Sequence, residues 1–219
     1  MLDNIKAVIF DLDGTLIDSL WVWKQVDIEF LKKHGITPPE DLQKTIEGLS
    51  FVDTALYFKE KFGIQDSIED IMAEWSKMVS NYYSSVIEIK KGVKEFLEYL
   101  KINNFKIGIA TSNSHDLVES VLRRNEIFDY FEVIVTTDEV SNSKTEPDVF
   151  LEAARRLNVE PEHCLVFEDT ISGATGAKKA GMRVTGIFDE HGTCTPEEFE
   201  EYVDEIFDDY EYILSNYCN

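Results

Sequence analysis

The sequence predicts an α/β protein: a doubly wound parallel sheet, with a subdomain of about four helices inserted after the first strand. In the second part of the chain, short apolar runs alternate with helical patterns, which is typical of strand–helix–strand units in a parallel sheet. Between the first apolar run and this part, only helical patterns occur. We therefore expect a core made of residues 1–16 and 89–219, and a helical insert made of residues 17–88.

The first strand is predicted to end in two carboxylates. The apolar run Ala7–Phe10 is typical of a strand that is buried on both faces, and Asp11 and Asp13 follow it. Alternate residues of an extended chain share a face, so the two acids start out on the same side. Gly14 then allows a sharp turn away from the strand. Two buried acids are costly unless a cation lies between them or one of them attacks a substrate.

Two other interpretations of this turn are possible from the sequence. A strand that ends in a solvated acidic turn explains Asp-x-Asp-Gly equally well on its own, because short motifs are weakly specific. A calcium loop fits poorly, because it requires Gly at its sixth position and Glu at its twelfth, where this chain has Leu16 and Val22.

The insert shows helical periodicity throughout, with turn residues between the helices. We expect helices over Ser19–His34 with Ser19 as N-cap, around Leu42, Ile46 and Leu49, over Val52–Phe62 after a loop at Gly48-Leu49-Ser50, and over Ile68–Tyr82.

After residue 91 strands and helices alternate. Strands are expected at 105–110, 131–135, 164–167 and 182–187, and helices at 93–102, 117–124, 147–157 and 173–180. The acidic tail, residues 196–219, is expected to be helical, with one possible strand near Ile206.

The composition limits the class of partner. The chain has 21 basic and 43 acidic residues, a formal net charge of −22, and such a surface repels nucleic acid and anionic membranes. We therefore expect neither nucleic acid nor a membrane as a partner, and an anionic substrate would need a metal ion and a well-placed lysine.

The cysteines (Cys164, Cys194 and Cys218) have no disulfide or metal-site spacing, and no signal peptide or transmembrane stretch is found. A cytoplasmic protein with reduced thiols is expected, with a monomer favoured.

Polar residues gather at one rim of the predicted sheet, beyond the carboxyl ends of the strands, where open α/β sheets bind ligands. These residues are Asp11 and Asp13, Thr111-Ser112-Asn113, Glu168 and Asp169, with Lys144 in the loop before a helix. Each group alone has a structural explanation: a helix N-cap, a surface lysine or an acidic turn. Their joint placement indicates a metal site next to groups that can bind an anion.

These motifs resemble those of the haloacid dehalogenase-like (HAD) phosphohydrolases, nearest the β-phosphoglucomutase-like branch with a helical cap. The resemblance covers nearly the whole chain and implies a Rossmann-like core, with residues 17–88 as the cap. The motifs in this sequence are Asp11-Leu12-Asp13-Gly14-Thr15, Thr111-Ser112-Asn113, Lys144 with Pro147-Asp148, and Glu168-Asp169-Thr170 with Gly173.

The resemblance implies a Mg²⁺-dependent phosphatase that acts on a small phosphorylated metabolite. Asp11 would be the nucleophile that forms an aspartyl-phosphate, and Asp13 the general acid and then the general base. Dehalogenases of the family lack the second aspartate, so Asp13 indicates phosphoryl transfer. Phosphate would be held by Thr111, by the N–H groups at Ser112 and Asn113, and by Lys144. Mg²⁺ would be held by Asp11, the backbone carbonyl of Asp13, Asp169, and Glu168 directly or through water.

Three positions depart from the family's pattern. Thr145 stands where Pro commonly follows the motif lysine, which puts the shape of the Lys144 loop in doubt. In the resembling mutase, a histidine and a substrate-gripping arginine align with Trp23 and Phe51. These two residues are either part of the cap core or substrate-specificity residues. In both cases the polar side chains with which the mutase holds its substrate are missing.

The sequence leaves three alternatives to a phosphatase. A phosphomutase of the β-phosphoglucomutase type would use the same chemistry on a sugar phosphate. A receiver-type phospho-acceptor also combines acids, a hydroxyl and a lysine on a parallel sheet, but its acids come in a different order. A binding protein on an inactive enzyme scaffold would show no turnover.

Overall fold

The computed structural model describes residues 1–46 and 51–218, with the backbone alone for residues 43 and 44. The loop predicted at Gly48-Leu49-Ser50 lies outside the described residues. The chain forms two compact units, one of residues 1–19 and 87–219 and the other of residues 20–86. No helix among the described residues is long and apolar enough to cross a membrane.

The larger unit is built on a six-stranded sheet in the order β3-β2-β1-β4-β5-β6, in which every neighbouring pair is parallel. This confirms the predicted doubly wound sheet, including the strand near Ile206. The strands are β1 (Ala7–Phe10), β2 (Lys106–Thr111), β3 (Val133–Thr136), β4 (Cys164–Glu168), β5 (Arg183–Ile187) and β6 (Glu205–Phe207).

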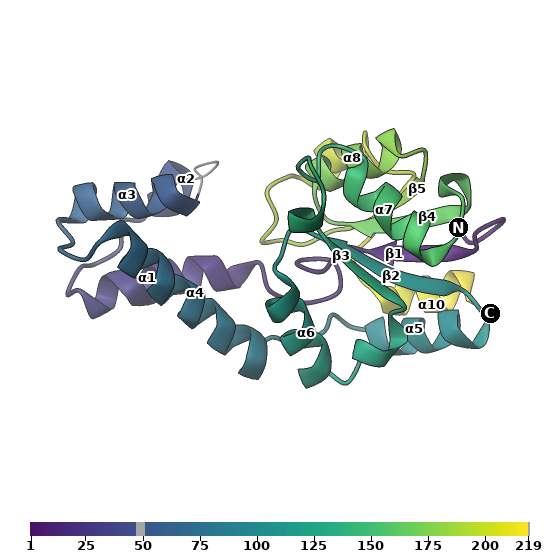
Figure 1. The fold of residues 1–219 in the computed structure, drawn as a ribbon, viewed down its shortest axis with the longest axis horizontal. Helices are drawn as coiled ribbons and strands as arrows, with labels where there is room; N and C mark the ends of the chain where they lie inside the picture. The colour runs from purple at the N-terminus through teal and green to yellow at the C-terminus, as the bar shows by residue number, and fades with distance from the viewer. Residues whose placement is uncertain (47–50, 219) are drawn as a thin grey trace. The chain divides into compact units, whose positions relative to one another are not determined.

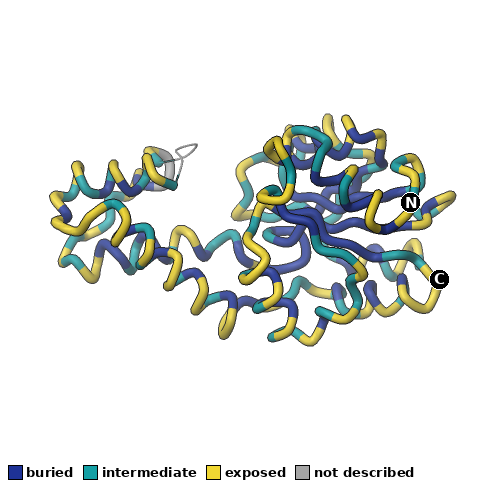
Figure 2. Tube along the Cα trace, in the orientation of Figure 1, coloured by how far each residue is buried: buried dark blue, intermediate teal, exposed yellow. Residues whose placement is uncertain are grey.

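Helices cover both faces of the sheet (Figure 1). α7 (Asp148–Leu157) and α8 (Ile171–Lys179) lie on one face, and α5 (Val93–Ile102) and α10 (Tyr210–Tyr217) on the other. Figure 2 shows the central strands buried along their length. Alternate side chains of β1 therefore point into two separate apolar layers, one on each face of the sheet.

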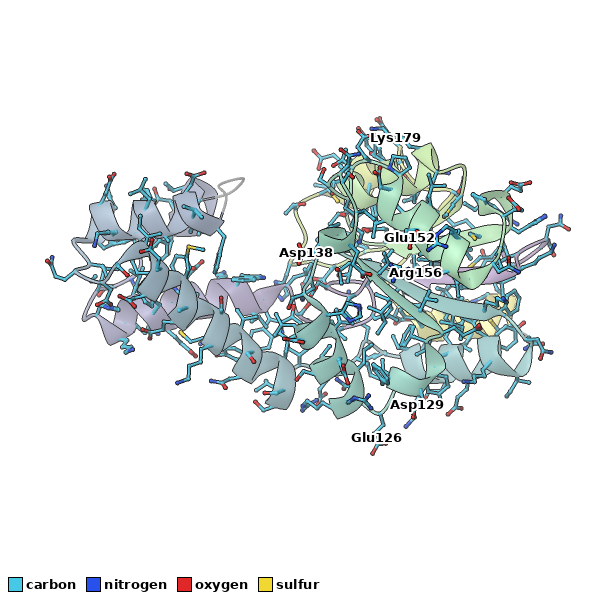
Figure 3. The ribbon with its side chains drawn as sticks, in the orientation of Figure 1. Glu126, Asp129, Asp138, Glu152, Arg156 and Lys179 are labelled. Atoms are coloured by element: carbon cyan, nitrogen blue, oxygen red, sulfur yellow. The ribbon has the colours of Figure 1, made fainter. Side chains whose placement is uncertain are left out.

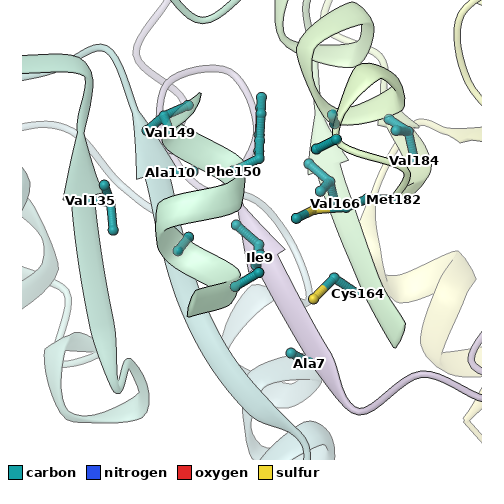
Figure 4. Packing of buried hydrophobic residues seen from close by; sticks show 14 of the residues in the cluster. Ala7, Ile9, Ala110, Val135, Val149, Phe150, Cys164, Val166, Met182 and Val184 are labelled. Carbon is teal, nitrogen blue, oxygen red and sulfur yellow. The ribbon is translucent and has the colours of Figure 1, made fainter. Parts of the chain in front are cut away.

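The layer beneath α7 and α8 is aliphatic, and Ile9 of β1 lies within it beside Ala110, Phe150 and Val166 (Figure 4). The opposite layer is aromatic. The ring of Phe10 stacks on Phe167 with centroids 5.1 Å apart. Because β1 packs against both layers, its carboxyl end has a fixed position in the sheet.

The remaining elements of this unit are α6 (His115–Arg124), α9 (Pro196–Phe199) and short 3-10 turns at 128–130, 137–139 and 161–163. On the outer side of α7, Glu152 pairs with Arg156 at 2.7 Å (Figure 3). Such exposed pairs contribute little to stability.

The described residues of the smaller unit form four helices: α1 (Trp21–Lys33), α2 (Leu42–Ile46), α3 (Phe51–Phe62) and α4 (Ile68–Ser85). Its core is aromatic, and the ring of Trp75 lies 5.5 Å from Phe30 and 4.9 Å from Phe58. Ser67 caps α4 by accepting the N–H of Asp70.

The predicted N-cap of the first helix is wrong. α1 begins at Trp21, its N-cap is Leu20, and no side chain caps it. The hydroxyl of Ser19 instead donates to Asp13 Oδ1 at 2.7 Å. A carboxylate acceptor makes a stronger hydrogen bond than a neutral partner would, so the serine is drawn away from the helix end.

The two connections to the helical unit run side by side within the larger unit. Ile17 and Ile89 form an antiparallel bridge, the N–H of Asp18 donates to the carbonyl of Glu88, and that of Lys90 donates to the carbonyl of Leu16. Both connections are therefore hydrogen-bonded to each other within the larger unit as far as these residues.

Candidate active site

Three buried carboxylates meet where β1 and β4 end. The two strands are neighbours, with Phe10 opposite Phe167, so the residues that follow them come together. One carboxylate oxygen from each of Asp11, Glu168 and Asp169 lies within 4.8 Å of the others. The sequence predicted that these acids would share a rim, and the structure brings them together.

Lys144 reaches this cluster from the loop before α7. Its Nζ forms ion pairs with Asp11 Oδ1 and, at 2.5 Å, with Glu168 Oε1. The lysine is buried, with 8% of its side chain exposed. Thr145 therefore does not prevent the lysine from reaching Asp11. Lys144 bridges two of the carboxylates in this structure.

Glycines of α8 make room for this arrangement. A Cβ at Gly173 would collide with the carboxylate of Glu168, and a Cβ at Gly176 would collide with the backbone carbonyl of Lys144. Gly176 was not predicted as part of the site. The signal for it is the pair of glycines three residues apart on a helix, where glycine is otherwise unfavourable.

One oxygen of Glu168 is used to shape the turn after β4. Its Oε2 accepts the N–H groups of Asp169 and Thr170 at 3.0 and 2.9 Å and the hydroxyl of Thr170 at 2.8 Å. Its Oε1 is buried, faces the cluster and pairs with Lys144 Nζ.

Burial dominates the electrostatics of the cluster. It raises the pKa of Asp11 from 3.8 to about 7, with Lys144 opposing this rise and Glu168 and Asp13 adding to it. Burial, followed by the charges of Asp11 and Glu168, also raises the pKa of Asp169 well above its ordinary value. Burial lowers the pKa of Lys144, but the two carboxylates outweigh it and raise the pKa overall.

These residues fit a hard divalent cation. All three side chains offer carboxylate oxygens, these oxygens lie within 4.8 Å of one another, and one lysine faces the three acids. Mg²⁺ prefers such oxygen ligands and binds through few carboxylates. Asp11, Asp169 and Glu168 Oε1 are therefore the side chains that could hold it.

The carboxylate of Asp13 is not part of the three-acid cluster. It accepts hydrogen bonds from Ser19 Oγ at 2.7 Å and from Asn113 Nδ2 at 2.9 Å. Asn113 thus holds Asp13, a contact that the sequence did not predict. Asp13 and Asn113 are both partly exposed, so the carboxylate is held in place without being sealed off.

The predicted phosphate-binding residues follow β2. Thr111 is buried, and its Oγ1 accepts the N–H of Asn113 at 3.1 Å. Ser112, by contrast, is exposed. The α6 helix begins at His115, directly after this turn, so its N-terminal N–H groups also lie at this end of β2.

The two predicted specificity residues belong to the helical unit. Their rings meet edge to face, with the Trp23 and Phe51 centroids 5.8 Å apart, and Phe51 also contacts Trp75. Trp23 is 45% exposed, so it is not a fully buried core residue, whereas Phe51 is half-buried.

The chain resembles known proteins over most of its length. A family model described as haloacid dehalogenase-like hydrolase matches residues 8–187. The chain is 34% identical to a phosphorylated carbohydrates phosphatase of Thermotoga maritima, covering 84% of this chain and 85% of that protein. It is 33% identical to (DL)-glycerol-3-phosphatase 2 of Arabidopsis thaliana, covering 85% and 80%.

Solved structures resemble the chain over nearly its full length. A candidate β-phosphoglucomutase of Thermotoga maritima superposes with a TM-score of 0.86 at 31% identity and covers 96% of this chain and 97% of that one.

The raised pKa values predict a pH-dependent response to Mg²⁺. The folded metal-free chain keeps the Asp11 proton up to about pH 7, whereas the unfolded chain loses it near 3.8. The free energy of unfolding of the metal-free protein should therefore fall as pH rises through this window.

Bound Mg²⁺ would replace the proton and should raise the melting temperature by about 5–10 °C at pH 8. The rise at pH 5 should be much smaller, because protons compete with the metal. Calorimetry at both pH values tests this, and an equal or larger rise at pH 5 would contradict it.

Proposed function

The chain belongs to the haloacid dehalogenase-like hydrolase family, and we propose that it is a Mg²⁺-dependent phosphatase that forms an aspartyl-phosphate on Asp11. The observation that carries this proposal is the ion pair of Lys144 with Asp11, set beside Glu168 and Asp169 in a buried cluster. The phosphatases named among the relatives support hydrolysis of a phosphoric monoester. The substrate is proposed to be a small phosphorylated metabolite. The free cysteines fit a cytoplasmic location.

In the first step, a carboxylate oxygen of Asp11 attacks phosphorus and the bond to the substrate oxygen breaks. Asp13 donates its proton to the leaving oxygen, so that an alcohol departs. Ser19 and Asn113 hold the Asp13 carboxylate in place for this transfer. Thr111, the N–H groups after it and Lys144 bind the phosphoryl oxygens and offset their charge.

In the second step, Asp13 takes a proton from water as the water oxygen attacks the phosphorus of the aspartyl-phosphate. The bond to Asp11 breaks, and inorganic phosphate and the free carboxylate are regenerated. Mg²⁺ bound by Asp11, the Asp13 backbone carbonyl, Asp169 and Glu168 would neutralise charge on the phosphoryl group. Lys144 keeps Asp11 oriented between turnovers through their ion pair.

The helical unit is proposed to act as a cap that sets substrate choice. The exposed Trp23 and the adjoining Phe51 present an aromatic surface instead of a charged side chain that would hold the substrate. A substrate whose non-phosphate end is partly apolar would suit this surface.

A phosphomutase is the second candidate, favoured by the solved structure assigned as a candidate β-phosphoglucomutase. A mutase must hold a bisphosphate at both ends, which an arginine does well because it binds phosphate bidentately. The aromatic pair at Trp23 and Phe51 offers no such contact. The receiver interpretation has little support, because the strand order is that of a dinucleotide-binding type of sheet and differs from the flavodoxin-like order.

Removing the nucleophile should abolish turnover. Asp11→Asn keeps the side-chain volume but cannot form the acyl-phosphate, so phosphate release should fall by more than about a thousandfold, or about 4 kcal/mol of barrier. Asp129→Asn, which removes the same charge from a 3-10 turn, is the matched control and should be unaffected. Activity of Asp11→Asn within about tenfold of wild type would show that Asp11 is not the nucleophile.

Hydrolysis should be the outcome with a sugar phosphate. Loss of a charge-assisted contact costs about 1.5–3 kcal/mol, enough to weaken the hold on a distal phosphate by tenfold or more. With β-glucose 1-phosphate, Mg²⁺ and a bisphosphate primer, phosphorus NMR should therefore show inorganic phosphate as the main product. Efficient formation of glucose 6-phosphate with little free phosphate would instead establish the mutase.

A further inference from the structure

The C-terminal helix α10 lies outside the residues matched by the family model, yet it is fixed firmly to the sheet-containing unit. Asp209 caps it by accepting the N–H of Tyr212 at 3.0 Å, and the N–H of Tyr210 donates to the carbonyl of Lys91. A Cβ at Gly92 would lie 2.7 Å from the backbone nitrogen of Glu211, so only glycine allows this approach. The first turn of α10 is therefore held at a fixed position.

Tyr210, in that first turn, is completely buried among aromatic rings. Its ring centroid lies 5.4 Å from that of Phe96 and 5.5 Å from that of Phe167. Packing alone would be served by phenylalanine, and a buried hydroxyl is costly unless it is hydrogen-bonded. The Tyr210 hydroxyl donates to the backbone carbonyl of Thr15 at 3.3 Å.

Thr15 connects this contact to the acid cluster. The residue is fully buried, and its Oγ1 donates to Asp169 Oδ1 at 3.3 Å. The turn that carries Thr15 starts at Gly14, which has a φ of 77°, and the N–H of Leu16 donates to the carbonyl of Leu12 within it. The Thr15 carbonyl points out of this turn and accepts the hydroxyl of Tyr210. The hydroxyl of Tyr210 is thus placed to hold the backbone from which the Thr15 hydroxyl reaches Asp169.

We propose that Tyr210 is a positioning residue for the metal site, acting through Thr15 on Asp169. This inference rests on the proposed function, because it takes Asp169 as a Mg²⁺ ligand. The Thr15 hydroxyl occupies one oxygen of Asp169 and leaves the other for the cation, and Tyr210 keeps that hydroxyl at its place. Outer partners of ligating carboxylates affect metal affinity in this way. The C-terminal helix therefore contributes to the reaction without touching the substrate.

The test is calorimetric titration of Mg²⁺ into the metal-free full-length protein. Tyr210→Phe keeps the ring packing and removes the hydroxyl, and it should weaken Mg²⁺ binding by about fivefold, less than the roughly 10–100-fold typical of a residue bonded directly to a ligand. Thr15→Val should weaken it at least as much, and Thr15→Ser, which keeps the hydroxyl, should restore most of the affinity. Tyr212→Phe removes a hydroxyl from the exposed side of the same helix and should bind like wild type.

The outcomes are separable. If wild type binds Mg²⁺ and Tyr210→Phe binds it equally well, Tyr210 serves packing alone and this inference fails while the proposed function stands. If wild type itself does not bind Mg²⁺, both fail. The contrast between Thr15→Val and Thr15→Ser tests the contact of Thr15 with Asp169, on which the inference depends, and equal Mg²⁺ affinity of these two variants would overturn it.

Discussion

The structure depends on one buried ion pair, that of Lys144 with Asp11. Three carboxylates and one lysine share a site with little access to water. The carboxylates repel one another and lose their hydration. The ion pair with Lys144 offsets these two costs only in part, because the desolvation of buried charges can exceed the attraction within one pair. The proposed Mg²⁺ ion would supply the second positive charge, and phosphoryl transfer depends on such neutralisation.

The fold meets this constraint through backbone packing. β1 and β4 are adjacent, so Asp11 and Glu168 follow paired strand residues, and the turn after β4 is locked by three hydrogen bonds to one oxygen of Glu168. α8 supplies the space: its glycines admit the Glu168 carboxylate and the carbonyl of Lys144. Glycine weakens a helix by about 1 kcal/mol, so its presence twice on α8 reflects this close approach.

The sequence was sufficient for the sheet and for the acids, because both depend on local pattern: apolar runs predict strands, and the residues after them lie at one rim. It could not show contacts between distant side chains. The hydrogen bonds of Ser19 and Asn113 to Asp13, and of Tyr210 to Thr15, join residues whose neighbours in sequence carry no sign of the partner. The pattern around Ser19 predicts a helix cap for that reason, because serine before a helix favours a cap.

The central claim is that the carboxylate of Asp11 becomes phosphorylated during turnover. It is tested most directly by rapid acid quench of the enzyme with substrate and Mg²⁺, borohydride reduction of any acyl-phosphate, and peptide mass spectrometry. The account predicts that the reduction product appears at position 11 alone and is absent when Mg²⁺ is withheld. A product at another aspartate, or turnover with no trapped residue at any time, would contradict it.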